Sequence, residues 1–417
     1  MMSNLTETMR NILERRRERS GLRRLTTASD NSTDFSSNDF LSLRTSAQLR
    51  AAYMQHLTGE FDLGSGGSRL LDGNSKFAEQ LETDIAAFHG APAGLLFNSG
   101  FDANSGVYAC VPQAGDVIIY DEYIHASVHE GMRLSRARTR VSFSHNSVAS
   151  LRETLVSIKR VNSSITSGNA NVFIGVESVY SMDGDVAPLA DIVCCMDELL
   201  PMNNGYIIVD EAHATGVVGL RGAGLVCDLG LQDRVFVRVH TFGKALSCNG
   251  AIVLCSDITR QYLINYARPL IYSTFMSYPA LAAIRASYEL LWSGKAETQR
   301  SRLWKLIQHF DRRLTELDVK TDAHGAKLVQ VSPTPAKSPI FSILTSYPRE
   351  LARFCQDAGF VVRPIVPPTV PRGAERVRVC LHTCNSTSEI DSLVQCIGRW
   401  MNGSSGGQGS AWKLSRL

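Results

Sequence analysis

The sequence lacks an apolar run long enough to cross a membrane, because each hydrophobic stretch is soon interrupted by a charged residue or a glycine. A spanning helix needs roughly 18–20 consecutive apolar residues, so we expect no membrane-embedded segment. A secretory signal peptide is also missing, and with it the oxidising compartment in which structural disulfides form. These absences exclude an integral membrane protein and a disulfide-stapled secreted domain.

Paired cysteines and an excess of one charge are missing as well. The 10 Cys residues are scattered without a CxxC pair, so we expect reduced thiols and no metal site. Lys and Arg number 43 against 40 Asp and Glu, a net charge of +3, and aromatic residues make up only 8%. Because no basic patch is interleaved with aromatic side chains, the sequence excludes a nucleic-acid-binding groove.

The two ends of the chain carry patterns of their own. Residues 1–24 contain seven Arg and three Glu with apolar residues at roughly helical spacing. Mitochondrial transit peptides avoid acids, so this pattern favours an amphipathic surface helix. Residues 402–410 are rich in Gly and Ser and predict a flexible tail, which ends in Ser415-Arg416-Leu417. This tripeptide differs from the Ser-Lys-Leu address only in its cation, so we expect a peroxisomal import receptor to read it, with the cytoplasm as the alternative location.

The middle of the chain alternates short β-branched runs with helix-length segments. This alternation predicts an α/β fold with a mostly parallel sheet covered by helices. After residue 279 a helical stretch, 281–317, precedes separate strands and predicts a smaller α+β domain completed by the N-terminal segment. The expected strands of the sheet are 94–97, 117–120, 140–143, 172–176, 206–210, 235–240 and 251–254, and those of the small domain are 340–344, 360–364 and 376–381. The expected units are 1–60 (N-terminal helix and segment), 61–285 (large domain), 286–400 (small domain) and 401–417 (tail).

Two of these strands end in residues suited to chemistry. Ligand-binding residues of open α/β sheets gather beyond the carboxyl ends of the strands. Asp210 ends one apolar run and His213 follows in the next turn, so we expect the two together at this edge. The next run leads through Thr241 to Lys244, which lies among small residues. A lysine there is poorly placed as a solvated cation and well placed as a Schiff-base amine.

In their order along the chain these segments resemble the pyridoxal-phosphate enzymes of the aspartate-aminotransferase fold (fold type I), and more narrowly the α-oxoamine synthase family. The resemblance covers residues 10–400, nearly the whole chain, and implies a seven-stranded large domain and a smaller C-terminal domain. The motifs that carry it are Phe35-Ser36-Ser37-Asn38-Asp39-Phe40-Leu41, Gly64-Ser65-Gly66-Gly67-Ser68-Arg69, Gly100-Phe101, residues 177–185, Asp210 with His213, Thr241-Phe242-Gly243-Lys244, Tyr266-Ala267-Arg268-Pro269 and Pro367-Pro368-Thr369-Val370-Pro371.

The resemblance implies four catalytic residues around pyridoxal 5'-phosphate. Lys244 would hold the cofactor covalently and, once displaced by the amino-acid substrate, remove the α-proton as a general base. Asp210 would keep the pyridine nitrogen protonated, so that the ring withdraws electrons. His213 would reach the ring hydroxyl, and His125 would stack on the face of the ring.

The phosphate of the cofactor needs amides and hydroxyls. Gly100 and Phe101 follow a strand and open a helix, whose N-terminal amides are suited to an anion. The resemblance adds the hydroxyls of Thr241 and Ser181 on the cofactor side. It also implies that Thr274 serves the phosphate of a neighbouring subunit, and therefore a homodimer with shared active sites.

Four residues are expected to contact the substrates. Arg378 matches the carboxylate-binding arginine of the family, a role that suits a guanidinium fork, and Asn38 lies beside it. Arg23 and Thr369 match positions near the acyl substrate.

The resemblance implies a decarboxylating condensation of an amino acid with an acyl-CoA. Residues 68–75 and 267–272 look most like the biotin-pathway branch, which joins L-alanine to pimeloyl-CoA. Ser68, where other members have Thr, leaves room for the methyl group of alanine. Phe40 and Ser42 replace the usual Tyr and Gly near the acyl entrance, so the acyl chain stays open. The alternative is a relative that uses a polyketide or fatty acyl thioester in a specialised pathway.

Two other classes of protein fit the sequence less well than the enzyme does. A catalytically silent subunit would have lost the lysine, but Lys244, Asp210, His213 and His125 are all present. A dinucleotide-binding dehydrogenase would need a GxGxxG run after its first strand and an acid about 20 residues later, and the sequence has neither. The sequence therefore favours the enzyme.

Overall fold

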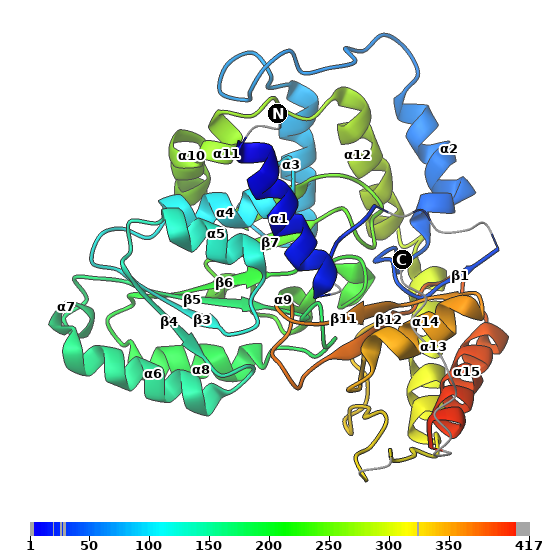
Figure 1. Cartoon of the computed structure of the whole chain (residues 1–417). Helices are drawn as coiled ribbons and strands as arrows, with labels where there is room; N and C mark the ends of the chain where they lie inside the picture. The colour runs from blue at the N-terminus through cyan, green and yellow to red at the C-terminus, as the bar shows by residue number, and fades with distance from the viewer. Residues whose placement is uncertain (1–3, 20, 26, 28–30, 323–324, 406–417) are drawn as a thin grey trace.

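The computed structural model describes residues 4–19, 21–25, 27, 31–322 and 325–405. The tripeptide Ser415-Arg416-Leu417, which carries the peroxisomal prediction, lies outside the described residues. Figure 1 shows a large part built on a central sheet and a smaller part formed by the C-terminal third of the chain. Within the described residues, no helix combines the length and the apolar character that a membrane span requires.

Seven strands form the central sheet, in the order β2-β8-β7-β6-β5-β3-β4. β8 runs antiparallel to β2 and β7, and the other neighbours are parallel, so the predicted mostly parallel sheet is confirmed. β2, β5, β7 and β8 are buried along their whole length, which explains the near-continuous apolar sequences of β2, β5 and β8. The strands are β2 (Ala93–Phe97), β3 (Val117–Asp121), β4 (Thr139–Phe143), β5 (Val172–Glu177), β6 (Gly205–Asp210), β7 (Val237–Thr241) and β8 (Ala251–Cys255).

Helices cover both faces of the sheet (Figure 1). On one face, Val107 of α4 and Met132 of α5 belong to a buried apolar cluster with Val239 of β7. On the other, Leu155 of α6 belongs to a second cluster with Val209 of β6. The helices of this part are α2 (Ala47–His56), α3 (Lys76–Phe88), α4 (Gly100–Cys110), α5 (Ala126–Leu134), α6 (Val148–Val161), α7 (Ser163–Thr166), α8 (Leu189–Leu199), α9 (Leu225–Asp228), α10 (Asp257–Tyr266), α11 (Arg268–Ile271) and α12 (Tyr278–Trp292), with short 3-10 turns at Leu43–Thr45, Leu220–Gly222 and Gln232–Arg234.

The smaller part has its own sheet, β11-β12-β9, with antiparallel neighbours. The N-terminal segment completes it, as predicted: β1 pairs with β10, and the amide of Cys380 donates to the carbonyl of Phe35 at 2.8 Å. Its elements are β1 (Thr33–Asp34), β9 (Ile340–Leu344), β10 (Phe360–Val361), β11 (Arg363–Ile365), β12 (Arg376–Cys380), α13 (Glu297–Thr315), α14 (Pro348–Asp357) and α15 (Thr387–Ser405).

The structure places helix ends near three of the expected boundaries. The stretch 281–317 is not one helix, because Gly294 adopts a φ of 74° and separates α12 from α13. The boundary between residues 285 and 286 falls inside α12, which continues to Trp292. The tail does not begin at residue 401, because α15 runs to Ser405 and Met401 is buried.

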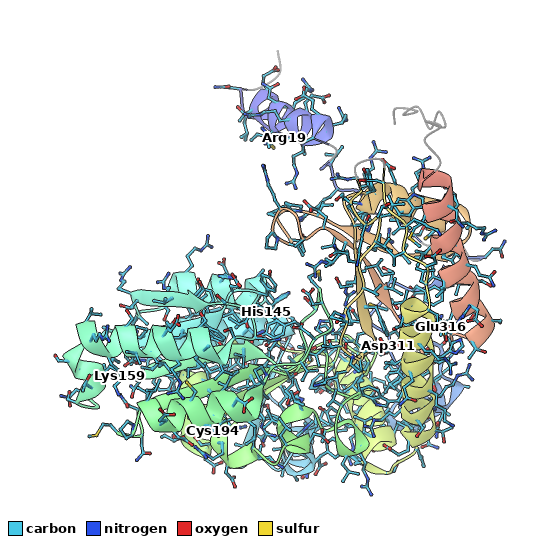
Figure 2. All side chains as sticks on the ribbon, turned by 90° about the horizontal axis from the view of Figure 1, so that it is seen from below. Arg19, His145, Lys159, Cys194, Asp311 and Glu316 are labelled. Carbon is cyan, nitrogen blue, oxygen red and sulfur yellow. The ribbon has the colours of Figure 1, made fainter. Side chains whose placement is uncertain are left out.

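The first helix, α1 (Asn4–Glu18), stands apart from the rest of the chain, as Figure 2 shows from below. All of its residues are exposed, including Leu5 (64%) and Leu13 (50%). The predicted amphipathic surface helix is therefore present.

Candidate active site

A pocket of about 480 Å³ opens at the carboxyl ends of the parallel strands. It brings together eight residues predicted from the sequence: Asn38, Gly100, Phe101, His125, Asp210, His213, Thr241 and Lys244. These residues come from the N-terminal segment, the start of α4, the start of α5 and the ends of β6 and β7. The expectation that Asp210, His213 and Lys244 lie together at this edge of the sheet is confirmed, and the roles of the eight residues stay predictions.

Lys244 lies in a tight loop between the antiparallel strands β7 and β8. The amide of Phe242 donates to the carbonyl of Gly250 at 3.0 Å, and the amide of Cys248 donates to the carbonyl of Phe242 at 2.8 Å. Burial lowers the pKa of Lys244, although Asp210 and Glu177 counteract this effect. A lowered pKa leaves more of the amine neutral, as a nucleophile or a proton acceptor requires.

Asp210 ends β6 and is held in place by two donors. The amide of Ala212 donates to its Oδ1 at 2.9 Å, and Asn104 Nδ2 donates to its Oδ2 at 2.7 Å. Asn104 lies on α4 and also donates to Ser127 Oγ at 3.1 Å, so it links Asp210 to the start of α5. The sequence analysis did not identify Asn104 as a site residue. The one signal in the sequence was a polar residue among the mostly small and apolar residues of α4.

The two histidines of the site differ in exposure. His125 begins α5, and its Nδ1 lies 2.8 Å from Ser127 Oγ. His125 is exposed at the pocket, whereas His213 is 4% exposed. Burial lowers the pKa of His125, and the charge of Asp210 opposes this shift. Burial also lowers the pKa of His213, and the nearby charge of Lys244 lowers it further, to well below its usual value. Near neutral pH both rings are therefore uncharged.

The pocket fits pyridoxal phosphate, because it presents polar groups that the described protein atoms leave unpaired. His213 Nδ1, Thr241 Oγ1 and Glu177 Oε1 are buried without a hydrogen-bond partner among those atoms. Buried polar groups are normally hydrogen-bonded, so such a cluster indicates a ligand. Gly100 opens α4, whose N-terminal amides are suited to an anion, and a Cβ there would lie 2.3 Å from Thr241 Cγ2, so a side chain at this position would collide with Thr241.

The sequence identifies Glu177 only as the first residue of the motif 177–185. It ends β5 opposite Asp210 in the register of β6 and lines the same pocket. Burial raises its pKa well above the usual range, and the neighbouring charge of Asp210 adds to this effect. The pocket therefore disfavours the charged form of this carboxyl group.

Five predicted site residues do not line the pocket: Arg23, Ser181, Thr274, Thr369 and Arg378. Arg378 is joined to it indirectly: its Nη2 donates to Asn38 Oδ1 at 2.9 Å, and its Nε donates to the Ser181 carbonyl at 2.6 Å. Thr274 is exposed, and its carbonyl accepts from Asn98 Nδ2, a pocket residue, at 2.8 Å. Arg23 and Thr369 are exposed, and both roles at the acyl substrate stay predictions.

The close contact at Gly100 gives a testable prediction. Gly100→Ala places a Cβ against Thr241 Cγ2 and should weaken cofactor binding roughly tenfold, since overpacking costs about 1–3 kcal/mol. Adding Thr241→Ser removes that methyl group, keeps the hydroxyl and should restore most of the affinity. The dissociation constant of pyridoxal phosphate, followed by the visible absorbance of the bound cofactor, measures both effects, with Thr241→Ser alone as the control. A double variant as weak as Gly100→Ala would contradict this steric explanation.

The fold and the pocket define a pyridoxal-phosphate enzyme of fold type I. The family model for aminotransferase class I and II matches residues 30–397. The chain is 55% identical to an 8-amino-7-oxononanoate synthase of Emericella nidulans, over 95% of this chain and 96% of that protein. It is 38% identical to the aminoacyl transferase sphA of Byssochlamys spectabilis, over 87% of this chain and 80% of that protein.

A solved serine palmitoyltransferase of Sphingomonas wittichii shares the fold, with a TM-score of 0.82, 24% identity and coverage of 97% of this chain and 100% of that chain. The chain belongs to the aminotransferase class I and II family, and the resemblance to the α-oxoamine synthases within it is confirmed.

Proposed function

We propose that the protein is an acyltransferase that condenses L-alanine with pimeloyl-CoA to give 8-amino-7-oxononanoate, CoA and CO2, a step of biotin biosynthesis. The observation that carries this proposal is the single pocket that holds Lys244, Asp210, His213 and His125 at the ends of the strands. The relative at 55% identity, an 8-amino-7-oxononanoate synthase, supports this reaction within the family.

Pyridoxal phosphate supplies an electron-withdrawing ring next to the α-carbon of the substrate. Asp210, buried at 7% exposure, would pair with the ring nitrogen and hold its proton. The amides at the start of α4 and the Thr241 hydroxyl would hold the phosphate, and the exposed ring of His125 would cover one face of the cofactor. His213, uncharged, would reach the ring hydroxyl.

The chain's own residues then move one proton and hold one carboxylate. Lys244 Nζ, as a neutral amine, takes the α-proton of alanine. The α-carbon forms a bond with the thioester carbonyl carbon, the C–S bond breaks, and CoA leaves as the thiolate, which takes a proton from solvent. Arg378 holds the alanine carboxylate until that group departs as CO2, and the proton then returns to the α-carbon.

A test of the substrates compares initial rates of thiol release. With pimeloyl-CoA, L-alanine should react at least ~10-fold faster than glycine or L-serine, because one methyl group in a fitted pocket is worth roughly 10–200-fold. With L-alanine, pimeloyl-CoA should be preferred over palmitoyl-CoA. Equal rates for the three amino acids, or no reaction of pimeloyl-CoA, would contradict the assignment.

A second candidate is an α-oxoamine synthase with another acyl thioester. The relative named aminoacyl transferase sphA, at 38% identity, supports this alternative. Phe40 is fully buried, and its ring centroid lies 6.0 Å from that of His213. Ser42 adopts a φ of 51°, a conformation that favours the glycine usual in the family. Reaction of L-alanine with a longer acyl-CoA in place of pimeloyl-CoA would favour this candidate.

We also propose a homodimer with shared sites. Phe101, which lines the pocket, is 47% exposed, Tyr272 is 71% exposed, and Thr274, close to Tyr272 in the sequence, is exposed as well. A partner copy would cover this surface and receive the Thr274 hydroxyl. Sedimentation of the holoenzyme at twice the 45.7 kDa of one chain is the expected result, and sedimentation at 45.7 kDa would contradict it.

The peroxisomal location remains our proposal from Ser415-Arg416-Leu417. A fluorescent protein that carries residues 402–417 at its C-terminus should colocalise with a peroxisomal marker. The same fusion with Arg416→Glu is the control and should remain diffuse. A diffuse signal from the unaltered fusion would contradict the proposal.

A further inference from the structure

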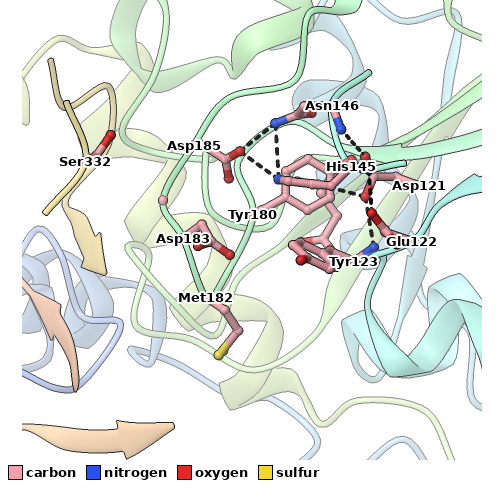
Figure 3. A network of polar contacts seen from close by, with 12 residues as sticks. Asp121, Glu122, Tyr123, His145, Asn146, Tyr180, Met182, Asp183, Asp185 and Ser332 are labelled. Carbon is pink, nitrogen blue, oxygen red and sulfur yellow. Dashed lines mark hydrogen bonds and ion pairs between the residues drawn. The ribbon is translucent and has the colours of Figure 1, made fainter. Parts of the chain in front are cut away.

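A histidine outside the pocket is held between two carboxylates, at the carboxyl ends of β3 and β4 (Figure 3). His145 Nδ1 lies 2.8 Å from Asp121 Oδ1, and His145 Nε2 lies 2.7 Å from Asp185 Oδ2. Its ring stacks on that of Tyr123, with centroids 4.4 Å apart, and meets the ring of Tyr180 edge-on at 4.5 Å. Both ring nitrogens therefore have partners within the protein, and two aromatic rings contact the imidazole.

The carboxylates keep this histidine charged. Burial disfavours the imidazolium, but the hydrogen bonds to Asp121 and Asp185 outweigh burial and raise the pKa of His145 to about 10. Asp121 is fully buried, and its second oxygen accepts from the amide of Asn146 at 2.8 Å. Asn146 Nδ2 also donates to Asp185 Oδ2 at 2.6 Å, so the pair of residues after β4 holds Asp185 from the large domain.

Asp185 belongs to the loop 181–185, which the small domain holds from its other side. Arg378 Nε donates to the Ser181 carbonyl at 2.6 Å, and Arg378 Nη2 donates to Asn38 Oδ1 at 2.9 Å. Arg376, on the same strand β12, forms an ion pair with Asp183 of this loop. The loop therefore connects His145 to the Ser181 carbonyl, which is one of the two acceptors that orient the guanidinium of Arg378.

We propose that His145 is a positioning residue for the amino-acid substrate: by tying Asp185 to Asp121 it fixes the loop 181–185, and through the Ser181 carbonyl it orients Arg378 toward the substrate carboxylate. This inference rests on the carboxylate-binding role proposed for Arg378. The positive charge of Arg378 also acts on Lys244 and His213, which places its side chain within electrostatic range of the reacting groups. A displacement of about 1 Å in such a group can cost on the order of 100-fold in rate.

The ion pairs give a prediction about stability and pH. The folded-state pKa of His145, about 10, is raised above the unfolded value of 6.5, so its stabilisation is complete below pH 6.5 and is lost as the pH rises through 10. The loss of unfolding free energy in His145→Gln should therefore be largest near pH 6 and should fade toward pH 10. Urea denaturation of the holoenzyme at several pH values measures it. A loss that does not change with pH would contradict the charged state.

The positioning role is tested by two ligands that differ only at the carboxylate. Isothermal titration of the holoenzyme, without an acyl donor, gives the dissociation constants of L-alanine and of L-alaninamide, in which a neutral amide replaces the carboxylate. His145→Gln should raise the dissociation constant of L-alanine by about 10-fold or more and change that of L-alaninamide much less. Arg378→Lys is the reference variant and should show the same selective loss, since lysine lacks the guanidinium fork. His129→Gln, on the exposed face of α5, is the matched control and should change neither constant.

The possible outcomes separate the two proposals. If Arg378→Lys leaves L-alanine binding intact, the carboxylate role of Arg378 is wrong and the inference about His145 falls with it. The positioning role alone is overturned if Arg378→Lys selectively weakens L-alanine binding but His145→Gln does not. The same holds if His145→Gln weakens the binding of both ligands equally. Should His145→Gln fail to fold, Asp185→Asn breaks the same link from a carboxylate that is 40% exposed. A selective loss of L-alanine binding there supports the inference, and unchanged binding overturns it.

Discussion

Lys244→Ala lowers kcat by at least ~10³-fold while the protein remains folded. The substitution removes both the amine that attaches the cofactor and the base that takes the α-proton, and general-base catalysis alone contributes roughly 10²–10⁴-fold. The surrounding loop is held by backbone hydrogen bonds of Phe242, Gly250 and Cys248, so the pocket should keep its shape. Thiol release from pimeloyl-CoA measures the rate, and thermal unfolding with and without pyridoxal phosphate measures the fold.

Lys305→Ala is the matched control for this variant, because Lys305 is exposed on α13 and lies outside the pocket. It should retain full activity. Borohydride reduction followed by mass spectrometry should attach the cofactor to Lys244 in the unaltered protein and to no lysine in Lys244→Ala. Activity within tenfold of the unaltered protein, or attachment at another lysine, would contradict the role of Lys244.

Asp210→Asn should lower kcat by roughly 10²–10³-fold, the size expected when one group that stabilises developing charge is lost. A neutral amide cannot hold the proton on the ring nitrogen, so the ring withdraws electrons less strongly. The amide of Ala212 can still donate to the remaining oxygen, which should preserve the end of β6. The dissociation constant of L-alanine should change much less than kcat, because we propose that Arg378 makes the carboxylate contact.

Asp233→Asn is the control for the charge change, since Asp233 is exposed in the short turn before β7. It should leave kcat and the affinity for L-alanine unchanged. A loss of L-alanine affinity in Asp210→Asn as large as its loss of kcat would indicate a role in binding rather than in catalysis and would contradict the account.

The central sheet was predictable because its signal is local. Runs such as residues 172–176 and 251–254 are apolar throughout and rich in Val and Ile, and strands buried on both faces need that composition. The order of the strands and the antiparallel insertion of β8 depend on contacts far apart in the sequence, and no local pattern encodes them. Helix ends were less well predicted: the break at Gly294 is one residue in an otherwise helical pattern, and α15 extends into a stretch whose Gly and Ser content indicated a tail.

The pocket was predictable in part. Asp210, His213 and Lys244 follow strands, and the rule that strand ends meet at one edge of the sheet places them together. Asn104 and Glu177 were missed as site residues because their importance arises from burial beside Asp210, which requires the packed structure. His145 was missed for the same reason, since Asp121 and Asp185 meet it only when β3, β4 and the loop after β5 are assembled.

The most direct test of the proposed reaction is its stoichiometry with L-alanine labelled with ¹³C in the carboxyl group and pimeloyl-CoA. The account predicts equal amounts of labelled CO2, free CoA thiol and 8-amino-7-oxononanoate, and the label should be absent from that product. Thiol release without labelled CO2, or a product that retains the label, would contradict a decarboxylating condensation.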